Sequence, residues 1–449
     1  MPHAPLVAVP VPPRRGRRRR GTDVACLASR VARPHPPLRS RATAAAQGTR
    51  TVQEDDVTEF DAKREERIRR LLEHLRNDTT DQFEGTVSFS PTEFTDADLA
   101  ARERELIFAR VPSIVAHGSE IPEPNDFITL QLPRNNAIVV RQPDGGIKAF
   151  VNQCRHRGAL LEEAASGKCR LFSCGYHRWS YDTDGTLRTI TRDNTFGDLD
   201  RSQFGLLELP AEERHGFIWV IDSVGAEIDV AAWLGPEMDE VLAGYKLDNL
   251  VSFRAEGFDE PCNWKLMQDA FLDGYHIQYA HPNTAGKIVH TNVYAFEDYG
   301  RHCRWLAPRK TIDRWIDEDP GDQSLAKHVT ESHLLLPNST LLRLPDNHFE
   351  LLTFRPDPVD PGRCRMEMRV IVPRLEETSY DEETWNKRWQ RNWQILLDVL
   401  HAEDFPLLRG SQRALASQDA GPMVFGRNEV ANQVFHRETQ RLLAADDAS

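Results

Sequence analysis

Two short segments between residues 152 and 185 constrain this chain more than any other feature, because each supplies one cysteine and one histidine. Cys154 and His156 form a Cys-x-His pair, and Cys174 and His177 form a Cys-x-x-His pair after seventeen intervening residues. Thiolates and neutral imidazoles are metal ligands. A fold that brings the two segments together therefore presents two sulfur and two nitrogen ligands to one inorganic centre.

This ligand set suits zinc or an iron-sulfur cluster, and its arrangement separates the two. Zinc ribbons and fingers favour pairs of cysteines or pairs of histidines, whereas each segment here mixes one of each. The mixture favours a dinuclear centre in which one iron takes both cysteines and the other takes both histidines, which is a Rieske [2Fe-2S] cluster. A zinc-bound pair of loops is the alternative. Cys169 lies between the pairs, outside the pattern, and is expected to be a packed thiol.

A second set of ligands follows in "NWKLMQDAFLDGYHIQYAHP", which contains Asp273, His276 and His281. We expect a helix that opens with Pro261 near its first turn. Asp273 and His276 are three residues apart and share a helical face, but His276 and His281 lie about 140° apart on an ideal helix. The helix must therefore loosen before Pro282 for both imidazoles to converge. Two such imidazoles are two thirds of the 2-His-1-carboxylate site that binds Fe(II) and leaves positions open for O2.

The stretches "NQCRHRGALL", "CGYHRWSYDTDG" and "NWKLMQDAFLDGYHIQYAHP" resemble the Rieske non-heme iron aromatic-ring-hydroxylating oxygenases, catalytic α (large) subunit. The resemblance covers most of residues 90 to 445. It implies that the third iron ligand is a carboxylate on a C-terminal helix. We select Asp404 in "LHAEDFPLLRGSQRAL", because related sequences carry this ligand as the second residue of a Glu-Asp pair. Glu403 is the main alternative, and Asp398 and Asp419 are weaker ones.

The resemblance also implies a role for Asp273, which in that family bridges to a cluster ligand of a neighbouring subunit. The corresponding ligand here is His177, and family α subunits form head-to-tail trimers with this contact at each interface. A carboxylate between two imidazole N–H groups offers a short path for electrons. Asn263, Trp264 and Lys265 match the family's opening of the same helix, and Trp264 is expected in the core.

The pattern of apolar residues predicts an α+β fold. Dense charge at helical spacing predicts an exposed helix over residues 57–76, and a second helix follows with Thr95 as its cap. Short β runs with an Asp-Gly-Gly turn indicate a small all-β unit. Longer runs indicate an antiparallel sheet flanked by helices at 380–401, 403–417 and 426–443, of the helix-grip type by resemblance. The expected parts are a disordered basic tail (1–50), N-terminal helices (51–118), an all-β Rieske [2Fe-2S] domain (119–225) and a mononuclear iron catalytic domain (226–449).

Charge is spread unevenly along the chain, and this limits its partners. Residues 1–50 hold eleven arginines and one acid, whereas the remaining residues carry 45 basic and 68 acidic side chains, a net charge of −23. An acidic body is a poor match for nucleic acid, and no run of about 18 apolar residues predicts a membrane span. Seven scattered cysteines favour a reducing compartment. We expect a cytoplasmic protein; alternatively, the basic tail targets an organelle or reflects a start codon assigned too far upstream.

The two predicted metal sites, in this order, predict the terminal oxygenase of an electron-transfer system. Electrons from a ferredoxin and/or a flavin reductase that draws on NAD(P)H would enter the Rieske cluster and pass by way of Asp273 to Fe(II), which activates O2. The expected reaction is cis-dihydroxylation of a small apolar, aromatic substrate, as in aromatic hydrocarbon catabolism. Monooxygenation and demethylation are variants, and a homotrimer with or without a β subunit is expected. The alternative is a Rieske electron-transfer or structural metalloprotein, which would lack the second iron.

Overall fold

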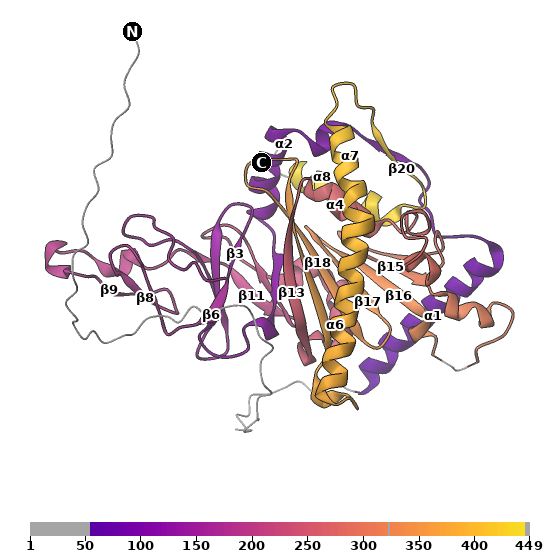
Figure 1. The fold of residues 1–449 in the computed structure, drawn as a ribbon, viewed down its shortest axis with the longest axis horizontal. Coiled ribbons are helices and arrows are strands. Elements are labelled where there is room, and N and C mark those ends of the chain that lie inside the picture. Colours follow the sequence, from indigo (N-terminus) through magenta and orange to yellow (C-terminus); the bar gives the residue numbers. More distant parts are fainter. Residues whose placement is uncertain (1–53, 322–323, 445–449) are drawn as a thin grey trace, which may run out of the picture. The chain divides into compact units, whose positions relative to one another are not determined.

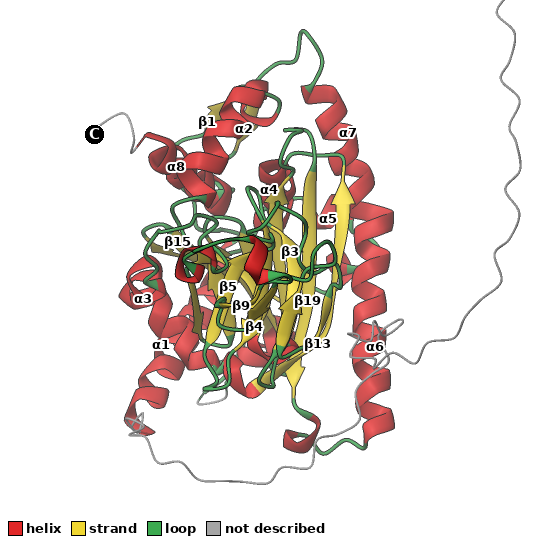
Figure 2. Cartoon of the chain, turned by 90° about the vertical axis from the view of Figure 1, so that its left-hand side faces the viewer, coloured by secondary structure: helices red, strands yellow, loops and turns green. Residues whose placement is uncertain are grey.

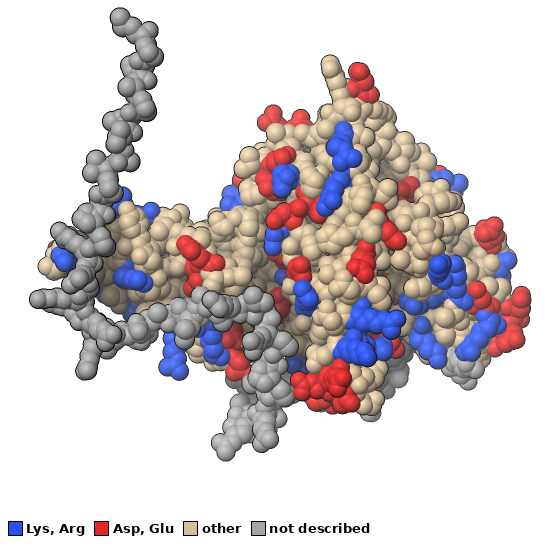
Figure 3. Space-filling view, viewed as in Figure 1, with Lys and Arg blue, Asp and Glu red and all other residues tan. Residues whose placement is uncertain are grey.

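The computed structural model describes residues 54–321 and 324–444. The predicted basic tail at 1–50 lies outside these residues. The described chain begins with helix α1 (Glu54–Asn77), which covers the helix expected over residues 57–76. Within the described residues, no helix is both long enough and apolar enough to cross a membrane. On the face shown in Figure 3, acidic and basic side chains are interspersed along the visible surface.

A seven-stranded antiparallel sheet organises the second half of the chain (Figure 1). Its order is β13-β19-β18-β17-β16-β15-β14, so its first strand in the sequence, β13, pairs with its last, β19. The predicted antiparallel sheet flanked by helices is therefore confirmed. The strands are β13 (Leu250–Glu260), β14 (Ala295–Tyr299), β15 (His302–Pro308), β16 (Val329–Leu335), β17 (Ser339–Leu344), β18 (His348–Pro356) and β19 (Cys364–Pro373).

Helix α4 (Trp264–Leu272) packs on one face of this sheet and identifies that face. Gln268 Nε2 donates to Thr340 Oγ1 at 2.7 Å, and the Phe271 ring stacks on Phe354 with centroids 5.4 Å apart. Because neighbouring residues in a strand point to opposite faces, every second residue from Thr340 or Phe354 lies on this α4 face. Helix α3 (Val230–Tyr245) precedes the sheet, and α8 (Val430–Ala444) ends the described chain.

The β strands between residues 113 and 220 form smaller antiparallel sheets, as expected for the all-β unit. Strand β2 (Ser113–His117) pairs with β12 (Phe217–Val220), so strand pairing in this unit begins before residue 119. The remaining strands are β3 (Asp126–Gln131), β4 (Asn136–Arg141), β5 (Ile147–Val151), β6 (Ser166–Lys168), β7 (Leu171–Ser173), β8 (Ser180–Asp182), β9 (Leu187–Thr189), β10 (Glu208–Leu209) and β11 (Ala211–Arg214).

Arg369 of β19 ties this all-β unit to the face of the large sheet opposite α4. Its Nε donates to Glu120 Oε1 at 2.8 Å, and its Nη2 donates to the Val115 carbonyl at 2.7 Å. Ser252 adds a backbone N–H that donates to Ser119 Oγ at 2.8 Å. Burial lowers the pKa of Arg369, but Glu120 and Glu367 outweigh burial and raise it, so the guanidinium stays charged.

The expected gap between the helices at 380–401 and 403–417 is wrong. Helix α6 (Glu382–Val399) and helix α7 (Phe405–Leu415) form one column along the strands (Figure 2), joined by a π turn over Leu400–Asp404. The Phe405 N–H donates to the Leu400 carbonyl five residues back. Pro406 has no N–H to continue the ordinary ladder, so a widened turn is accommodated at this point.

The second predicted helix is also shifted by one residue. Asp96, not Thr95, caps α2 (Ala97–Glu103), because Asp96 Oδ1 accepts the Leu99 N–H at 2.8 Å. Thr95 instead closes the preceding turn. Threonine and aspartate are both common N-cap residues. The backbone conformation determines which side chain can accept an N–H of the first helical turn.

Trp264 lies in the core, as expected, and it shares a buried acid with its neighbour Lys265. Trp264 Nε1 donates to Glu103 Oε2 at 2.8 Å, and the Lys265 ammonium pairs with the same carboxylate. Both members of the ion pair are 1% exposed. This interaction fixes the start of α4 against α2.

We expect Lys265→Met to lower the free energy of unfolding by about 3–5 kcal/mol, because Glu103 is left as an unpaired buried charge. Urea denaturation followed by circular dichroism measures the loss. The double variant Glu103→Gln/Lys265→Met removes both charges and should recover most of it. If the double variant is no more stable than the single one, the loss does not come from the unpaired carboxylate.

Candidate functional site

The two Cys-His segments fold into loops with the same backbone pattern. In each loop the cysteine N–H donates to the carbonyl five residues later, and the N–H four residues later donates back to the cysteine carbonyl. The fourth residue after each cysteine has a left-handed backbone, with φ of 72° at Gly158 and 61° at Arg178. These bonds join Cys154 to Ala159 (2.8 Å) and to Gly158 (2.9 Å), and Cys174 to Trp179 (2.9 Å) and to Arg178 (3.0 Å).

These loops bury the cysteines and leave the histidines half-buried. The His156 and His177 rings lie 4.6 Å apart between centroids, and His156 stacks on Trp179 at 4.8 Å. The Nδ1 atom of His156 is buried without a hydrogen-bond partner. A buried ring nitrogen with a free lone pair is available to a ligand.

The titration behaviour of the first loop suits metal binding. Burial raises the pKa of the Cys154 thiol, so a nearby positive charge is needed to hold it as a thiolate. Burial, His177 and Arg157 lower the pKa of His156, which favours the neutral ring. A metal binds the thiolate and the neutral imidazole.

The grouping of these four residues separates a cluster from a single zinc ion. Cys154 interacts with Cys174, and His156 lies beside His177. The four side chains do not form a set of three or more ligand atoms within 4.8 Å of one another. Among the described residues, such a set is found at another place in the chain. Two pairs that do not converge on a single point fit a [2Fe-2S] cluster.

That other group lies after α4, where the chain leaves the helix earlier than expected. Asp273 has φ −88° and ψ 112°, which is extended backbone, so Asp273 and His276 do not share a helical face and that expectation is wrong. Gly274 follows this break and lies close to Tyr294, whose hydroxyl would collide with a side chain at that position. The N-cap of α4 is Asn263, so Pro261 lies two residues before the cap and not inside the first turn.

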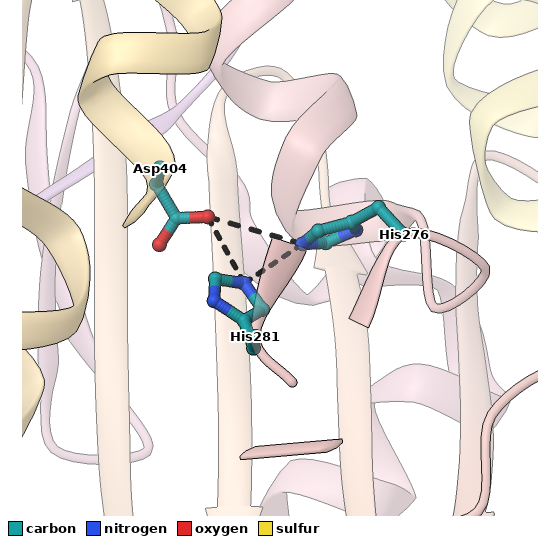
Figure 4. Close-up of side chains that lie close together, drawn as sticks. All are labelled: His276, His281 and Asp404. Carbon is teal, nitrogen blue, oxygen red and sulfur yellow. Dashed lines mark hydrogen bonds and ion pairs between the residues drawn. The ribbon is translucent and has the colours of Figure 1, made fainter. Parts of the chain in front are cut away.

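His276 and His281 stand at the two ends of the one-turn helix α5 (Ile277–Ala280). Their Nε2 atoms are 3.1 Å apart (Figure 4). Asp404 Oδ1 lies 3.1 Å from His281 Nε2 and 3.8 Å from His276 Nε2. Neighbouring ligand atoms on one first-row metal ion are about 3 Å apart, so these three atoms fit a single ion.

The π turn at Leu400–Asp404 decides which acid faces the histidines. Asp404 is 6% exposed and points at both Nε2 atoms, whereas Glu403 reaches the opposite side of the His281 ring. Glu403 Oε2 accepts from His281 Nδ1 and from Thr284 Oγ1, both at 2.7 Å. The weaker candidates Asp398 and Asp419 are exposed and lie outside this group.

Glu403 therefore fixes the orientation and the tautomer of His281. Burial raises the pKa of Glu403, but the hydrogen bonds from Thr284 and His281 outweigh it and lower the pKa, so the carboxylate stays anionic. Burial lowers the pKa of His281, and Asp404 and Glu403 together raise it. In the neutral ring the proton sits on Nδ1, and the Nε2 lone pair faces Asp404. The sequence signals Glu403 only as a possible ligand and gives no sign of Thr284.

Asp273 touches one of the two groups that it is expected to connect. Its Oδ2 lies 3.4 Å from His276 Nδ1, and its Oδ1 accepts the Tyr275 N–H at 2.6 Å. Within the described chain, no hydrogen bond or ion pair joins Asp273 to His177.

Comparisons with known proteins agree with both sites. The sequence model of the Rieske [2Fe-2S] domain matches residues 112–200, and that of the ring hydroxylating alpha subunit (catalytic domain) matches residues 247–445. The chain is 34% identical to the anthranilate 1,2-dioxygenase large subunit of Acinetobacter baylyi over 46% of its own length and 47% of that protein. It is 30% identical to the carnitine monooxygenase oxygenase subunit of Acinetobacter pittii over 74% of its length and 86% of that protein.

The fold is also that of known enzymes. A crystal structure of a quaternary ammonium Rieske monooxygenase superposes with a TM-score of 0.67 at 22% identity, over 79% of this chain and 94% of that one. In sequence, the chain spans about half the length of the dioxygenase subunits that it matches. The matched share is 47% for the anthranilate enzyme and 42% for a benzene 1,2-dioxygenase subunit of Pseudomonas putida.

We expect Glu403→Gln to weaken Fe(II) binding by about 10–100-fold, because His281 loses the anion that holds its Nδ1 proton. Anaerobic competition with a chelator measures the affinity. Asp398→Asn is the matched control, since Asp398 is exposed and contacts only Gln394, at 2.9 Å. Equal affinities for the two variants would contradict the orienting role of Glu403.

Proposed function

The chain belongs to the family of Rieske oxygenase α (large) subunits, and from this premise we propose that it is the terminal oxygenase component of an electron-transfer system. The observation that carries the proposal is the convergence of His276, His281 and Asp404 in a chain that also holds the Cys-His loops. An electron carrier would need only the loops. A buried carboxylate aimed at two imidazole nitrogens is the arrangement that an O2-activating iron requires.

We propose a role for each site residue. Cys154, His156, Cys174 and His177 hold the [2Fe-2S] cluster, and His276, His281 and Asp404 hold the mononuclear Fe(II). When bound, the cluster supplies one-electron transfer and the iron supplies O2 activation. Asp404 gives the iron site an anionic oxygen, and Glu403 keeps the proton of His281 away from it.

Asp273 is proposed to connect His276 with His177 of the partner subunit. Its carboxylate already lies beside His276, and part of its surface remains exposed to a second molecule, since its side chain is 18% accessible. A crystal structure of the quaternary ammonium enzyme is described in terms of inter-subunit electron transfer. The homotrimer expected from the family places such a contact at each interface.

We propose that the electrons come from NAD(P)H through a ferredoxin and/or a flavin reductase. The family works with electron-transfer partners, and the proposed cluster has to be reduced by one. A cytoplasmic location suits such partners, and a β subunit is compatible with this assignment.

We also propose domain limits at residues 119 and 226. Strand β2 extends the all-β unit to residues before 119.

Two substrate classes follow from the relatives. The aromatic dioxygenase subunit shares the higher identity with the chain, 34%, and supports dihydroxylation of an aromatic compound. The carnitine monooxygenase subunit matches more of the chain, 74% against 46%, and supports monooxygenation of a cationic compound as a second candidate. The sheet residues of the α4 face bear on this choice.

We expect purified protein to hold about three irons per chain and a Rieske spectrum, and Asp404→Ala to hold about two. The cluster spectrum should persist in the variant, while reductant-driven O2 uptake should be lost. Iron analysis, visible absorption and an oxygen electrode measure the three quantities. Asp419→Ala, at an exposed acid of the same region, should match wild type. Colourless, zinc-containing protein would overturn both metal assignments.

We expect Asp273→Asn to keep both metal sites but to slow reoxidation of the reduced protein by O2 by roughly 10–100-fold, because the anionic link between the imidazoles is lost. Stopped-flow absorption after anaerobic reduction follows the rate. Iron content and oligomeric state serve as controls. Wild-type reoxidation in a trimeric variant would remove Asp273 from the path.

A further inference from the structure

Glu350 is a buried acid at the centre of the large sheet. It lies on β18 between β17 and β19, where its neighbours in register are Leu342 and Val370. The residue is 8% exposed. Because hydrogen-bonded strands cover both edges of β18, this remaining accessibility has to come from a face of the sheet.

The register places Glu350 on the α4 face, which also faces the mononuclear site. Phe354, four residues further on β18, stacks on Phe271 of α4. Four residues along a strand span about 13 Å, and both side chains point the same way. The iron ligands follow directly after α4, so Glu350 lies on the same face as the site and farther along it.

Glu350 has no partner, unlike the other buried glutamates of the described chain. No hydrogen bond or ion pair to it is found among the described residues, and no charged group acts on its pKa. Burial alone raises the pKa of Glu350 to about 7. The other buried glutamates are all matched with cations: Glu103 with Lys265, Glu260 with Arg409, Glu331 with Arg64, Arg304 and Arg343, and Glu438 with Arg437 and Arg441.

The surroundings of Glu350 resemble the lining of a ligand site. Ser332 pairs with Leu342 in the same row of the sheet, and its Oγ is buried without a partner. Trp393 of α6 lies at the β13 end of this row, where Arg254 pairs with Val370. Its ring is 4.9 Å from the Arg254 guanidinium, and its Nε1 is also unpartnered. Leu342 is partly exposed although it lies on a central strand. Ligand sites combine apolar and aromatic walls with a few convergent polar groups.

We propose that Glu350 is a substrate-binding residue that receives a cationic nitrogen, so that the substrate of this oxygenase is an amine or a quaternary ammonium compound. The inference rests on the proposed function and narrows its substrate class. An isolated carboxylate in a dry site is costly, and a bound cation supplies the missing countercharge. His348, two residues away on the same face, does not compete, because burial lowers its pKa to about 4 and leaves it neutral.

The test compares alkyltrimethylammonium ions, including choline, with their neutral tert-butyl isosteres, which have nearly the same shape. Isothermal titration of the iron-loaded, cluster-containing protein gives the dissociation constants. We expect at least one cation to bind about tenfold or more tightly than its isostere, and Glu350→Gln to abolish this preference. Glu256→Gln is the matched control, since Glu256 lies on the same face but pairs with Arg254 at 2.8 Å.

A second readout does not depend on the choice of ligand. Glu350→Gln and Glu350→Leu should both raise the melting temperature of the ligand-free protein, because an uncompensated acid is removed. A cation should raise the melting temperature of wild type and not that of either variant. Absence of any cation preference in wild type, or its persistence in Glu350→Gln, would overturn the inference. Iron content, cluster spectrum and O2 uptake test the oxygenase assignment separately.

Discussion

Two imidazoles and a carboxylate can converge on one point only where the helices that carry them depart from regular geometry. In this chain the first departure is the break at Asp273, which turns His276 and His281 into the two ends of a single helical turn. The second is the π turn at Leu400–Asp404, which rotates Asp404 toward them. Three electron-rich atoms held between 3.1 and 3.8 Å apart repel one another unless a proton or a metal ion lies among them. The two departures from regular helix geometry therefore place three ligand atoms where a metal ion can bind.

The parts of this site that sequence reasoning reached are those set by local spacing. The Cys-x-His and Cys-x-x-His pairs and the two histidines of the second motif come from short segments, and the structure brings each set together. The sequence predicts that the helix loosens before Pro282, which the structure shows, but not that it ends as early as Leu272. At Gly274 the hydroxyl of Tyr294, twenty residues further on, occupies the space that a side chain would need, and this contact is not visible in the local sequence. The π turn was missed because the apolar pattern predicts two separate helices over 380–401 and 403–417 and does not show how they are joined. The orienting role of Glu403 also needs tertiary structure, since Thr284 and His281 lie more than a hundred residues away.

The buried glutamates of the large sheet are paired with cations, with Glu350 as the exception among the described residues. On the face away from α4, Arg369 of β19 donates a hydrogen bond to Glu120. Glu331 of β16 forms ion pairs with three arginines, Arg64, Arg304 and Arg343. These charged groups connect different secondary-structure elements. Matched buried ions hold elements in register, at a cost in desolvation that the pairing offsets. On the α4 face, Glu350 has no such partner. Stability alone would replace it by an apolar residue, so its presence points to a ligand rather than to the fold.

The proposed metal ligands lie on helical segments and the proposed substrate-binding residue lies on the sheet. This separation explains how one fold can occur in relatives with different substrates. The iron ligands come entirely from α5 and the π turn, whereas the residues farther along the α4 face belong to central strands held by backbone pairing. A strand side chain can change from apolar to acidic without moving the backbone that presents it, because the ladder does not involve side chains. Glu350 is an acidic side chain at such a position, flanked by Leu342 and Val370. The metal-binding residues and the proposed substrate-binding residue thus belong to separate elements, so the second can vary while the geometry of the first is kept.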